Sequence, residues 1–192
     1  MIGNYKEHAQ IWDWDGYDDW ENNEFWCKWA EIYGKNILIP MCALGKRGAY
    51  MAERGFNVTA FDITEEMVTE GNIRYGGIKN LNIIYGDIRN FDFNINTIDF
   101  TYIIDLCHLL NISDIQKAFD SINKHLRKNG CMVIEIGLPT KEPYDWSNET
   151  YHPKKPTYKD KKIWKTGNGY YDPNTKRTFI SQKVFIENDK GI

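Results

Sequence analysis

Short apolar runs alternate with longer amphipathic segments over the first 137 residues. The apolar runs predict buried strands of the kind found in parallel sheets, at residues 36–42, 57–61, 82–85, 100–104 and 131–136. Helical spacing predicts four helices in addition to these strands. The first covers 21–33, and a short second helix follows a turn at 45–48 and ends at Gly55. The third covers 64–75 and is capped by Thr64, and the fourth begins after residue 112. This alternation predicts an α/β fold, with a Rossmann-like, doubly wound, mostly parallel sheet and helices on both faces.

Two of these helices have more detailed expectations. The first helix places Phe25, Trp29 and Ile32 on one face. For the last helix, Ser113 and Gln116 match a capping box, and Gly130 is expected to end the helix. Its apolar residues at helical spacing are Ile115, Ala118, Phe119, Ile122 and Leu126.

The pattern changes after Gly137. Residues 138–168 are rich in Pro, Lys and Tyr and show no clear period. A β-hairpin is expected to follow, with strands at 169–171 and 178–186 around a turn at 172–175. We therefore divide the chain into an N-terminal aromatic and acidic lid with a helix (1–35), a Rossmann-like core (36–137) and a substrate-covering insertion with a hairpin (138–192).

Composition restricts the class of protein. The chain has 192 residues, 42% of them hydrophobic and 27% charged, which is typical of one globular domain. A net charge of −3 argues against a general nucleic-acid binder. The four cysteines form no CxxC pair, so neither a zinc ribbon nor another metal site is expected. The polar start and the lack of a long apolar run predict a cytoplasmic protein with no membrane partner.

Charge is unevenly distributed between the two ends of the chain. Residues 12–26 contain six acidic and no basic side chains, whereas residues 151–190 contain ten Lys or Arg and four Asp or Glu. Each segment is either a solvated surface or part of a contact or lid over a site. We keep both interpretations.

Four strand ends carry the candidate chemistry, because ligands of doubly wound sheets bind beyond the carboxyl ends of the strands. The loop after the first strand contains Gly45, which permits a close backbone approach, and leads into a helix whose N–H groups are expected to point at the ligand. Asp62 follows the second strand and can accept ribose hydroxyls. Asp87 follows the third strand and suits an adenine amino group. Asp105 to His108 follow the fourth strand and are expected to face the reacting end of the ligand.

At these positions the sequence resembles class I S-adenosylmethionine-dependent methyltransferases. The resemblance spans about residues 30–137 and rests on the stretch 36–67, which contains Ala-Glu-Arg-Gly and Phe-Asp-Ile-Thr, and on the stretches 85–91, 104–110 and 126–134. It implies methyl transfer from S-adenosylmethionine to a small-molecule acceptor by in-line displacement. The residues that it implies for cofactor binding are Met41, Cys42, Ala43, Gly45, Asp62, Ile63, Met67, Asp87, Ile88 and Asp105.

The sequence departs from the family pattern at three positions. Ile39 stands where the family usually carries Asp or Glu, and Met41 and Ala43 replace two of its usual glycines. These changes are expected to reshape the site around the methionine moiety, which backbone groups of residues 41–45 would then bind. The family's sheet also ends in an antiparallel pair after a further helix. Two interpretations stay open: the final section of the sheet is missing here, or the hairpin at 169–186 is an insertion whose partner elements are absent.

His108 is the candidate general base, and its alternative role is that of an ordinary loop residue. Trp12, Tyr17 and Trp20 are the candidate substrate-facing residues, because a sulfonium favours aromatic and acidic neighbours. The alternative for these aromatic residues, together with Tyr5 and Trp14, is packing of the first helix on the sheet.

Two other functions remain open at this point. Ala43-x-Gly45-x-x-Gly48, followed by Asp62, approximates the fingerprint of an NAD(P)-dependent oxidoreductase, although an alanine replaces the first glycine. The third possibility is a non-catalytic binding protein that keeps the fold with a decayed cofactor loop.

Overall fold

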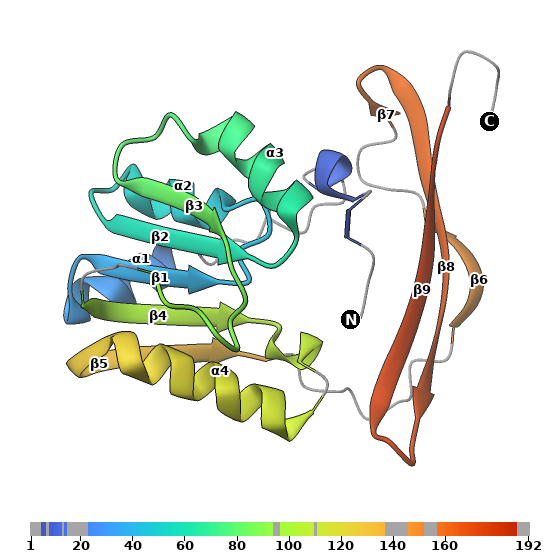
Figure 1. Cartoon of the computed structure of the whole chain (residues 1–192). Helices are drawn as coiled ribbons and strands as arrows, with labels where there is room; N and C mark the ends of the chain where they lie inside the picture. The colour runs from blue at the N-terminus through green and yellow to red at the C-terminus, as the bar shows by residue number, and fades with distance from the viewer. Residues whose placement is uncertain are drawn as a thin grey trace. The chain divides into compact units, whose positions relative to one another are not determined.

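Five parallel strands form the sheet of residues 1–137, which is the first of two compact units; residues 138–192 form the second (Figure 1). The computed structural model describes residues 5–6, 8–12, 14, 23–93, 97–109, 111–136, 146–151 and 157–187. The strand order is β3-β2-β1-β4-β5. The strands are β1 (Asn36–Pro40), β2 (Asn57–Asp62), β3 (Leu81–Tyr85), β4 (Ile98–Ile104) and β5 (Leu126–Glu135).

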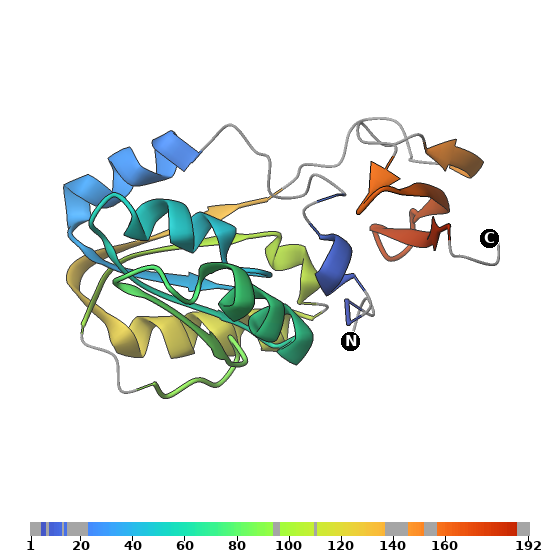
Figure 2. The same ribbon diagram turned by 90° about the horizontal axis from the view of Figure 1, so that it is seen from above.

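Helices cover both faces of this sheet, as Figure 2 shows. On one face, α1 (Asn23–Tyr33) and α2 (Lys46–Ala52) pack in a core with buried residues of β1, β2 and β4, and α3 (Glu65–Tyr75) borders the same core. On the other face, Ala118 and Ile122 of α4 (Ile112–His125) pack against Leu38 and Ile103. The predicted doubly wound fold is therefore confirmed. Short 3-10 helices, η1 (Ala9–Ile11) and η2 (Leu106–His108), complete the unit.

The face that α1 turns to the core is formed by Trp26, Cys27 and Ala30, and Trp26 stacks on Tyr102 of β4 with ring centroids 4.8 Å apart. The face with Phe25, Trp29 and Ile32 is the exposed one; Ile32 is 71% exposed. Both faces of this helix are rich in apolar residues, so periodicity alone does not decide between them.

Helix α3 begins after Thr64, as predicted, but the Thr64 side chain makes no capping hydrogen bond. The helix lies very close to the loop that follows β1. A Cβ atom at Gly71 would stand 2.4 Å from the carbonyl oxygen of Leu44, so only glycine fits at this position. The sequence thus fixes α3 directly against residues 43–45.

Two expectations for α4 are wrong. Its N-cap is Asn111, whose side chain accepts a hydrogen bond from the backbone N–H of Asp114, so Ser113 and Gln116 form no capping box. The helix ends at His125 rather than at Gly130, because β5 begins directly at Leu126. Residues 131–135 pair with β4 as predicted, and a register irregularity separates them from Leu126, which pairs with Ile98.

The second unit is an antiparallel sheet built around a long hairpin of β8 (Lys161–Asp172) and β9 (Arg177–Ile186). The hairpin and its turn are as predicted, and the carboxylate of Asp172 accepts hydrogen bonds from the Asn174 backbone and the Thr175 hydroxyl. The strand β8 is much longer than expected, and β6 (Trp146–Tyr151) and β7 (Thr157–Tyr158) pair with its other side. The region 138–168 therefore contains strands that its composition did not reveal.

Candidate functional site

The loops that follow β1, β2, β3 and β4 lie at one edge of the parallel sheet, because all four strands run in the same direction. Asp62 is the last residue of β2 and pairs with Tyr85 of β3. The backbone N–H of Gly86 donates to the Asp62 carbonyl oxygen over 3.0 Å, which places Gly86 and Asp87 beside the end of β2. The edge therefore brings the predicted strand-end residues together.

The loop after β1 has a left-handed backbone at every second residue. The φ angles are 55° at Met41, 50° at Ala43 and 80° at Gly45. Non-glycine residues avoid this region, which costs roughly 1–2 kcal/mol per residue. The loop thus has a conformation that glycine favours, although two of its three left-handed positions carry side chains. The following helix α2 begins at Lys46 and has only seven residues, so we assign no role in ligand binding to its N-terminus.

Asp62 links the loops of two strands. One carboxylate oxygen accepts the backbone N–H of Ala43 over 2.9 Å, and the other accepts the backbone N–H of Thr64 over 2.9 Å. Burial raises the pKa of Asp62 above its usual range, although these two hydrogen bonds and the Thr64 side chain oppose the shift. A carboxylate offers about four acceptor positions, so the chemistry of this group still fits a hydroxyl of a ligand.

Asp87 is held by a residue that the sequence reasoning missed, Arg89. Their closest approach is 2.6 Å, between Arg89 Nη2 and Asp87 Oδ2, and Arg89 Nε lies 2.9 Å from Oδ1. Burial alone would raise the pKa of Asp87, but the hydrogen bonds and the charge of Arg89 outweigh burial and lower it. The Asp-x-Arg spacing is the sequence signal that could have suggested this pair.

After β4, Asp105 has a left-handed backbone with φ 54° and precedes η2. Its carbonyl oxygen accepts the backbone N–H of His108 over 3.0 Å. The His108 side chain is exposed, and its ring meets the edge of the Tyr5 ring with centroids 5.8 Å apart. A positive charge on His108 opposes the rise in the pKa of Asp62 that burial causes. The candidate base therefore lies near both the N-terminal segment and the end of β2.

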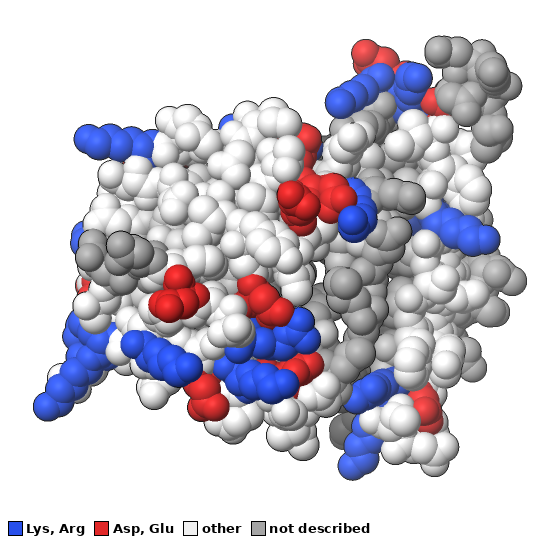
Figure 3. Space-filling view, viewed as in Figure 1, with Lys and Arg blue, Asp and Glu red and all other residues white. Residues whose placement is uncertain are grey.

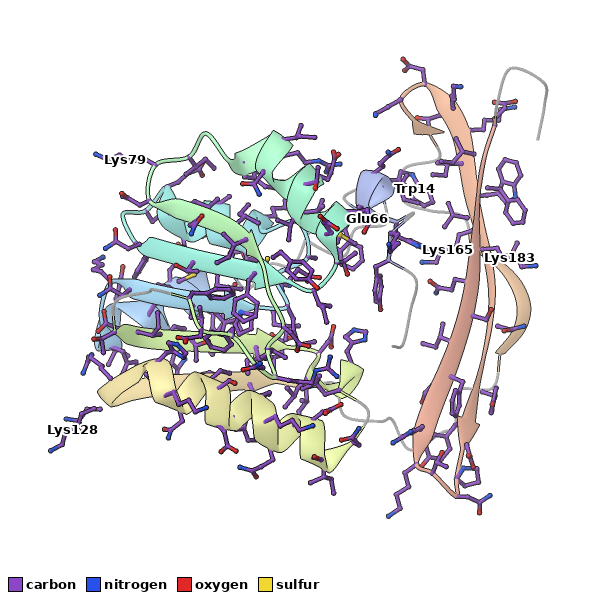
Figure 4. The ribbon with its side chains drawn as sticks, in the orientation of Figure 1. Trp14, Glu66, Lys79, Lys128, Lys165 and Lys183 are labelled. Carbon is purple, nitrogen blue, oxygen red and sulfur yellow. The ribbon has the colours of Figure 1, made fainter. Side chains whose placement is uncertain are left out.

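The N-terminal segment packs on the loop after β1. Ala9 is buried with Leu44 and Met67, and Tyr5, Trp12 and Ala43 border this cluster. Lys6 forms an ion pair with Glu66 over 3.2 Å, and Figure 4 shows Glu66 at the start of α3 beside η1. The aromatic residues Tyr5 and Trp12 thus pack beside the loop after β1, and their role as a cover for the edge stays a prediction. Tyr17 and Trp20 lie outside the described residues.

The other predicted site residues differ in exposure. Ile63 is 38% exposed, whereas Met67 and Ile88 are buried and Cys42 is half-buried. Ile39 is buried in the main core, so the position where the resemblance calls for a carboxylate is apolar here. Within the described residues, no group of three or more His, Cys, Asp or Glu is arranged to hold a metal ion. No helix of that part of the chain is long and apolar enough to span a membrane.

Charges of both signs are interspersed over α4 on the face of unit 1 seen in Figure 3. Asp114, in the first turn of this helix, contacts Arg89 over 3.3 Å and Lys117 over 3.2 Å. The surface beside Asp87 therefore has no strong field of a single sign.

Comparison with known proteins identifies the fold. Residues 37–130 match the family model of a methyltransferase domain. The Bacillus subtilis protein YqeM, named as a methyltransferase, is 26% identical over 121 residues; the match covers 58% of this chain and 47% of YqeM, so this chain spans about half of that relative. A crystal structure of an S-adenosylmethionine-dependent methyltransferase from Clostridium acetobutylicum matches with a TM-score of 0.68 and 16% identity, over 97% of this chain and 76% of that one.

A second structural match is CalS10, an amino pentose methyltransferase from Micromonospora echinaspora with S-adenosylmethionine bound. Its TM-score is 0.66 at 14% identity, and the match covers 97% of this chain and 83% of that one. The family match within unit 1 and the agreement of both folds lead to one conclusion: residues 37–130 are similar to a methyltransferase domain, and the chain has the fold of these S-adenosylmethionine-dependent methyltransferases.

Proposed function

We propose that this chain binds S-adenosylmethionine at the carboxyl edge of its parallel sheet and transfers the methyl group to a small-molecule acceptor. The observation that carries the proposal is the left-handed backbone of Met41 and Ala43. In the described part of unit 1, the left-handed residues that are neither Gly nor Asn are Met41, Ala43 and Asp105, and all three follow β1 or β4 at this edge. Strained residues of this kind concentrate at functional sites.

The chain's own groups suit the parts of such a cofactor. Asp62 would accept hydrogen bonds from the ribose hydroxyls, and Asp87 would accept a hydrogen bond from the adenine amino group. Backbone groups of residues 41–45 would bind the methionine end, because Ile39 provides no carboxylate there. We also propose that the cofactor contacts four further residues: Ile63, Met67, Ile88 and Asp105.

Methyl transfer is a displacement in which a lone pair of the acceptor attacks the methyl carbon while the carbon–sulfur bond breaks. S-adenosylmethionine, when bound, supplies an electrophilic methyl group and a neutral thioether as leaving group. The protein's main task is to hold the acceptor in line with that methyl group. His108, exposed beside Tyr5, would remove a proton from an acceptor that must lose one. Trp12, with Tyr17 and Trp20, would face the acceptor.

For the acceptor we propose a small amine. The acidic segment 12–26 supports this choice, because negative charge at an entrance attracts cations and repels phosphates. The amino pentose named as the acceptor class of CalS10 supports it as well. The basic segment 151–190 is the feature that works against it.

Titration calorimetry with S-adenosylhomocysteine, S-adenosylmethionine, NAD and NADP tests the cofactor. We expect the two S-adenosyl compounds to bind and the dinucleotides not to bind. Asp62→Asn should weaken S-adenosylhomocysteine binding roughly 10- to 100-fold, since it removes hydrogen bonds to a charged group. The control is Asp120→Asn, which changes an exposed carboxylate on α4 that contacts Gln116.

Transfer of a labelled methyl group to a panel of amines, phenols, phosphates and RNA then tests the acceptor. Labelling of the amines alone supports the proposal, and labelling of RNA alone contradicts a small-molecule acceptor. Binding of NAD without binding of either S-adenosyl compound would overturn the proposed function.

A further inference from the structure

Arg89 stands between two carboxylates beside the end of β3. Its guanidinium contacts Asp87 through Nε and Nη2, and its Nη1 lies 3.3 Å from Asp114 Oδ2. Arg89 therefore bridges two carboxylates rather than pairing with one. Its guanidinium joins the loop after β3 to the first turn of α4.

The backbone around Arg89 is fixed from two directions. Its own N–H donates to Asp87 Oδ1 over 2.9 Å, and the hydroxyl of Ser121 on α4 donates to its carbonyl oxygen over 3.0 Å. The backbone N–H of Asn90 also donates to the Asp87 carbonyl oxygen over 3.0 Å. The turn of residues 87–90 is thus tied to the sheet edge and to α4, which limits the orientations open to both side chains.

The hydrogen bonds from Arg89 occupy most of the acceptor positions of Asp87. On Asp87 Oδ1, the Arg89 backbone N–H and Nε use both positions. On Oδ2, Nη2 uses one at 2.6 Å, and Nε, at 3.0 Å, is shared with Oδ1. A carboxylate has about four such positions. Roughly one therefore remains, on Oδ2, and its direction is set by the geometry of the fork.

We propose that Arg89 is a positioning residue that orients Asp87 so that its one remaining acceptor position recognises the amino group of the ligand's base. This inference rests on the proposed function, and it names how that site selects its ligand. A 6-aminopurine donates a hydrogen bond to this position. A 6-oxopurine presents a carbonyl oxygen to the carboxylate instead, and the two acceptors repel each other.

Removal of the guanidinium changes the recognition as well as the charge. Asp87 loses the fork that orients it, and the negative charge of Asp114 then acts on it without an intervening cation. Among the described residues, the Lys117 ammonium pairs with Asp114, over 3.2 Å, and not with Asp87, so it does not restore the orientation of Asp87. We therefore expect the Arg89 variant to lose selectivity between bases, beyond any loss of stability.

The test compares the affinities of S-adenosylhomocysteine and its 6-oxo analogue, S-inosylhomocysteine, by calorimetry with the full chain. The wild type should prefer the 6-amino compound by roughly 10- to 100-fold, the range of one hydrogen bond to a charged group. Arg89→Met should reduce this ratio about tenfold, and Arg89→Lys should retain part of it. The matched control is Arg127→Met, which removes an Arg–Asp contact of 2.6 Å to Asp99 at the opposite end of β4 and should leave the ratio unchanged.

Asp87→Asn provides a second variant in case Arg89→Met does not fold. Its amide can donate to a 6-oxo group, so the preference should shift toward S-inosylhomocysteine, which a purely structural role would not cause. If Arg89→Met and Arg127→Met bind both compounds with the wild-type ratio, the inference is wrong while the proposed function stands. If the wild type binds S-adenosylhomocysteine no better than S-inosylhomocysteine, the inference is also wrong. If the wild type binds neither, the proposed function fails and the inference fails with it.

Discussion

Replacing Ala43 by glycine tests whether the loop after β1 is strained. The left-handed backbone at Ala43 costs an L-residue roughly 1–2 kcal/mol, and glycine avoids that cost. Two effects lower the stability of the glycine variant. Glycine gives the unfolded chain more conformational entropy, which costs about 0.4–1 kcal/mol of folding free energy. Loss of the methyl group costs about 0.8 kcal/mol more. Ala43→Gly should therefore change the free energy of unfolding by less than about 1 kcal/mol in either direction.

The matched control is Ala118→Gly in α4, where the side chain is fully buried and the backbone is helical. No strain is relieved there, so the variant loses about 1 kcal/mol of helix propensity and about 0.8 kcal/mol of buried methyl group. For a chain of this length, 1 kcal/mol shifts the melting temperature by about 2–4 °C. Ala118→Gly should melt roughly 4–8 °C below the wild type.

Urea denaturation and thermal melting of the three proteins measure these differences. The slope of the free energy against urea concentration must stay the same for the comparison to hold. A loss at Ala43→Gly as large as the loss at Ala118→Gly would refute the reasoning. It would mean that the methyl group of Ala43 stabilises the fold by more than the backbone strain destabilises it.

Two pH effects should follow from carboxylates of unit 1 whose pKa values are shifted in opposite directions. Burial favours a raised pKa for Asp99, but hydrogen bonds from the Asn36 backbone and Arg127 outweigh it and lower the pKa below 3.8. Its stabilisation is therefore present above pH 3.8 and lost as the pH falls through the lowered value, so in urea denaturation Asp99→Asn should cost about 1 kcal/mol at pH 7 and progressively less as the pH falls below 3.8. The pKa of Asp62 is instead raised, and hydroxyl binding needs its ionised form. Calorimetry should show S-adenosylhomocysteine affinity falling on acidification at pH values still above 3.8 in the wild type, but not in Asp62→Asn; equal pH profiles would contradict this.

Much of the parallel sheet was predictable because its strands are short apolar runs, four of which are followed directly by Gly or Asp. The predicted strand ends lie side by side, because Asp62 pairs with Tyr85, the last residue of β3, and Asp87 follows two residues later. The cap of α4 was not predictable in the same way, because Asn111 and Ser113 are both good N-cap residues and only tertiary packing selects one. The exposed face of α1 was ambiguous for a similar reason, since Trp26 and Trp29 compete for the core.

The second unit and Arg89 show two different limits of sequence reasoning. Strands β6, β7 and the first half of β8 are rich in Lys, Thr and Tyr, so they carry no apolar alternation that separates them from a loop. Arg89 follows Asp87 by two residues, a spacing that brings side chains together only in a particular turn. The left-handed conformation of Met41 and Ala43 was likewise hidden, because neither residue type favours it. These features depend on backbone geometry that composition does not encode.

The close approach of Gly71 to the Leu44 carbonyl oxygen has a mechanical consequence. Since no side chain separates Gly71 from the Leu44 carbonyl group, and Met67 packs with Leu44, a displacement of that loop must displace the helix too. The hydrogen bonds from Asn72 to the carbonyl oxygens of Val68 and Ile83 extend the same rigid body to β3. A ligand that reduces the motion of the loop should therefore slow amide hydrogen exchange along α3, at residues that the ligand itself does not contact.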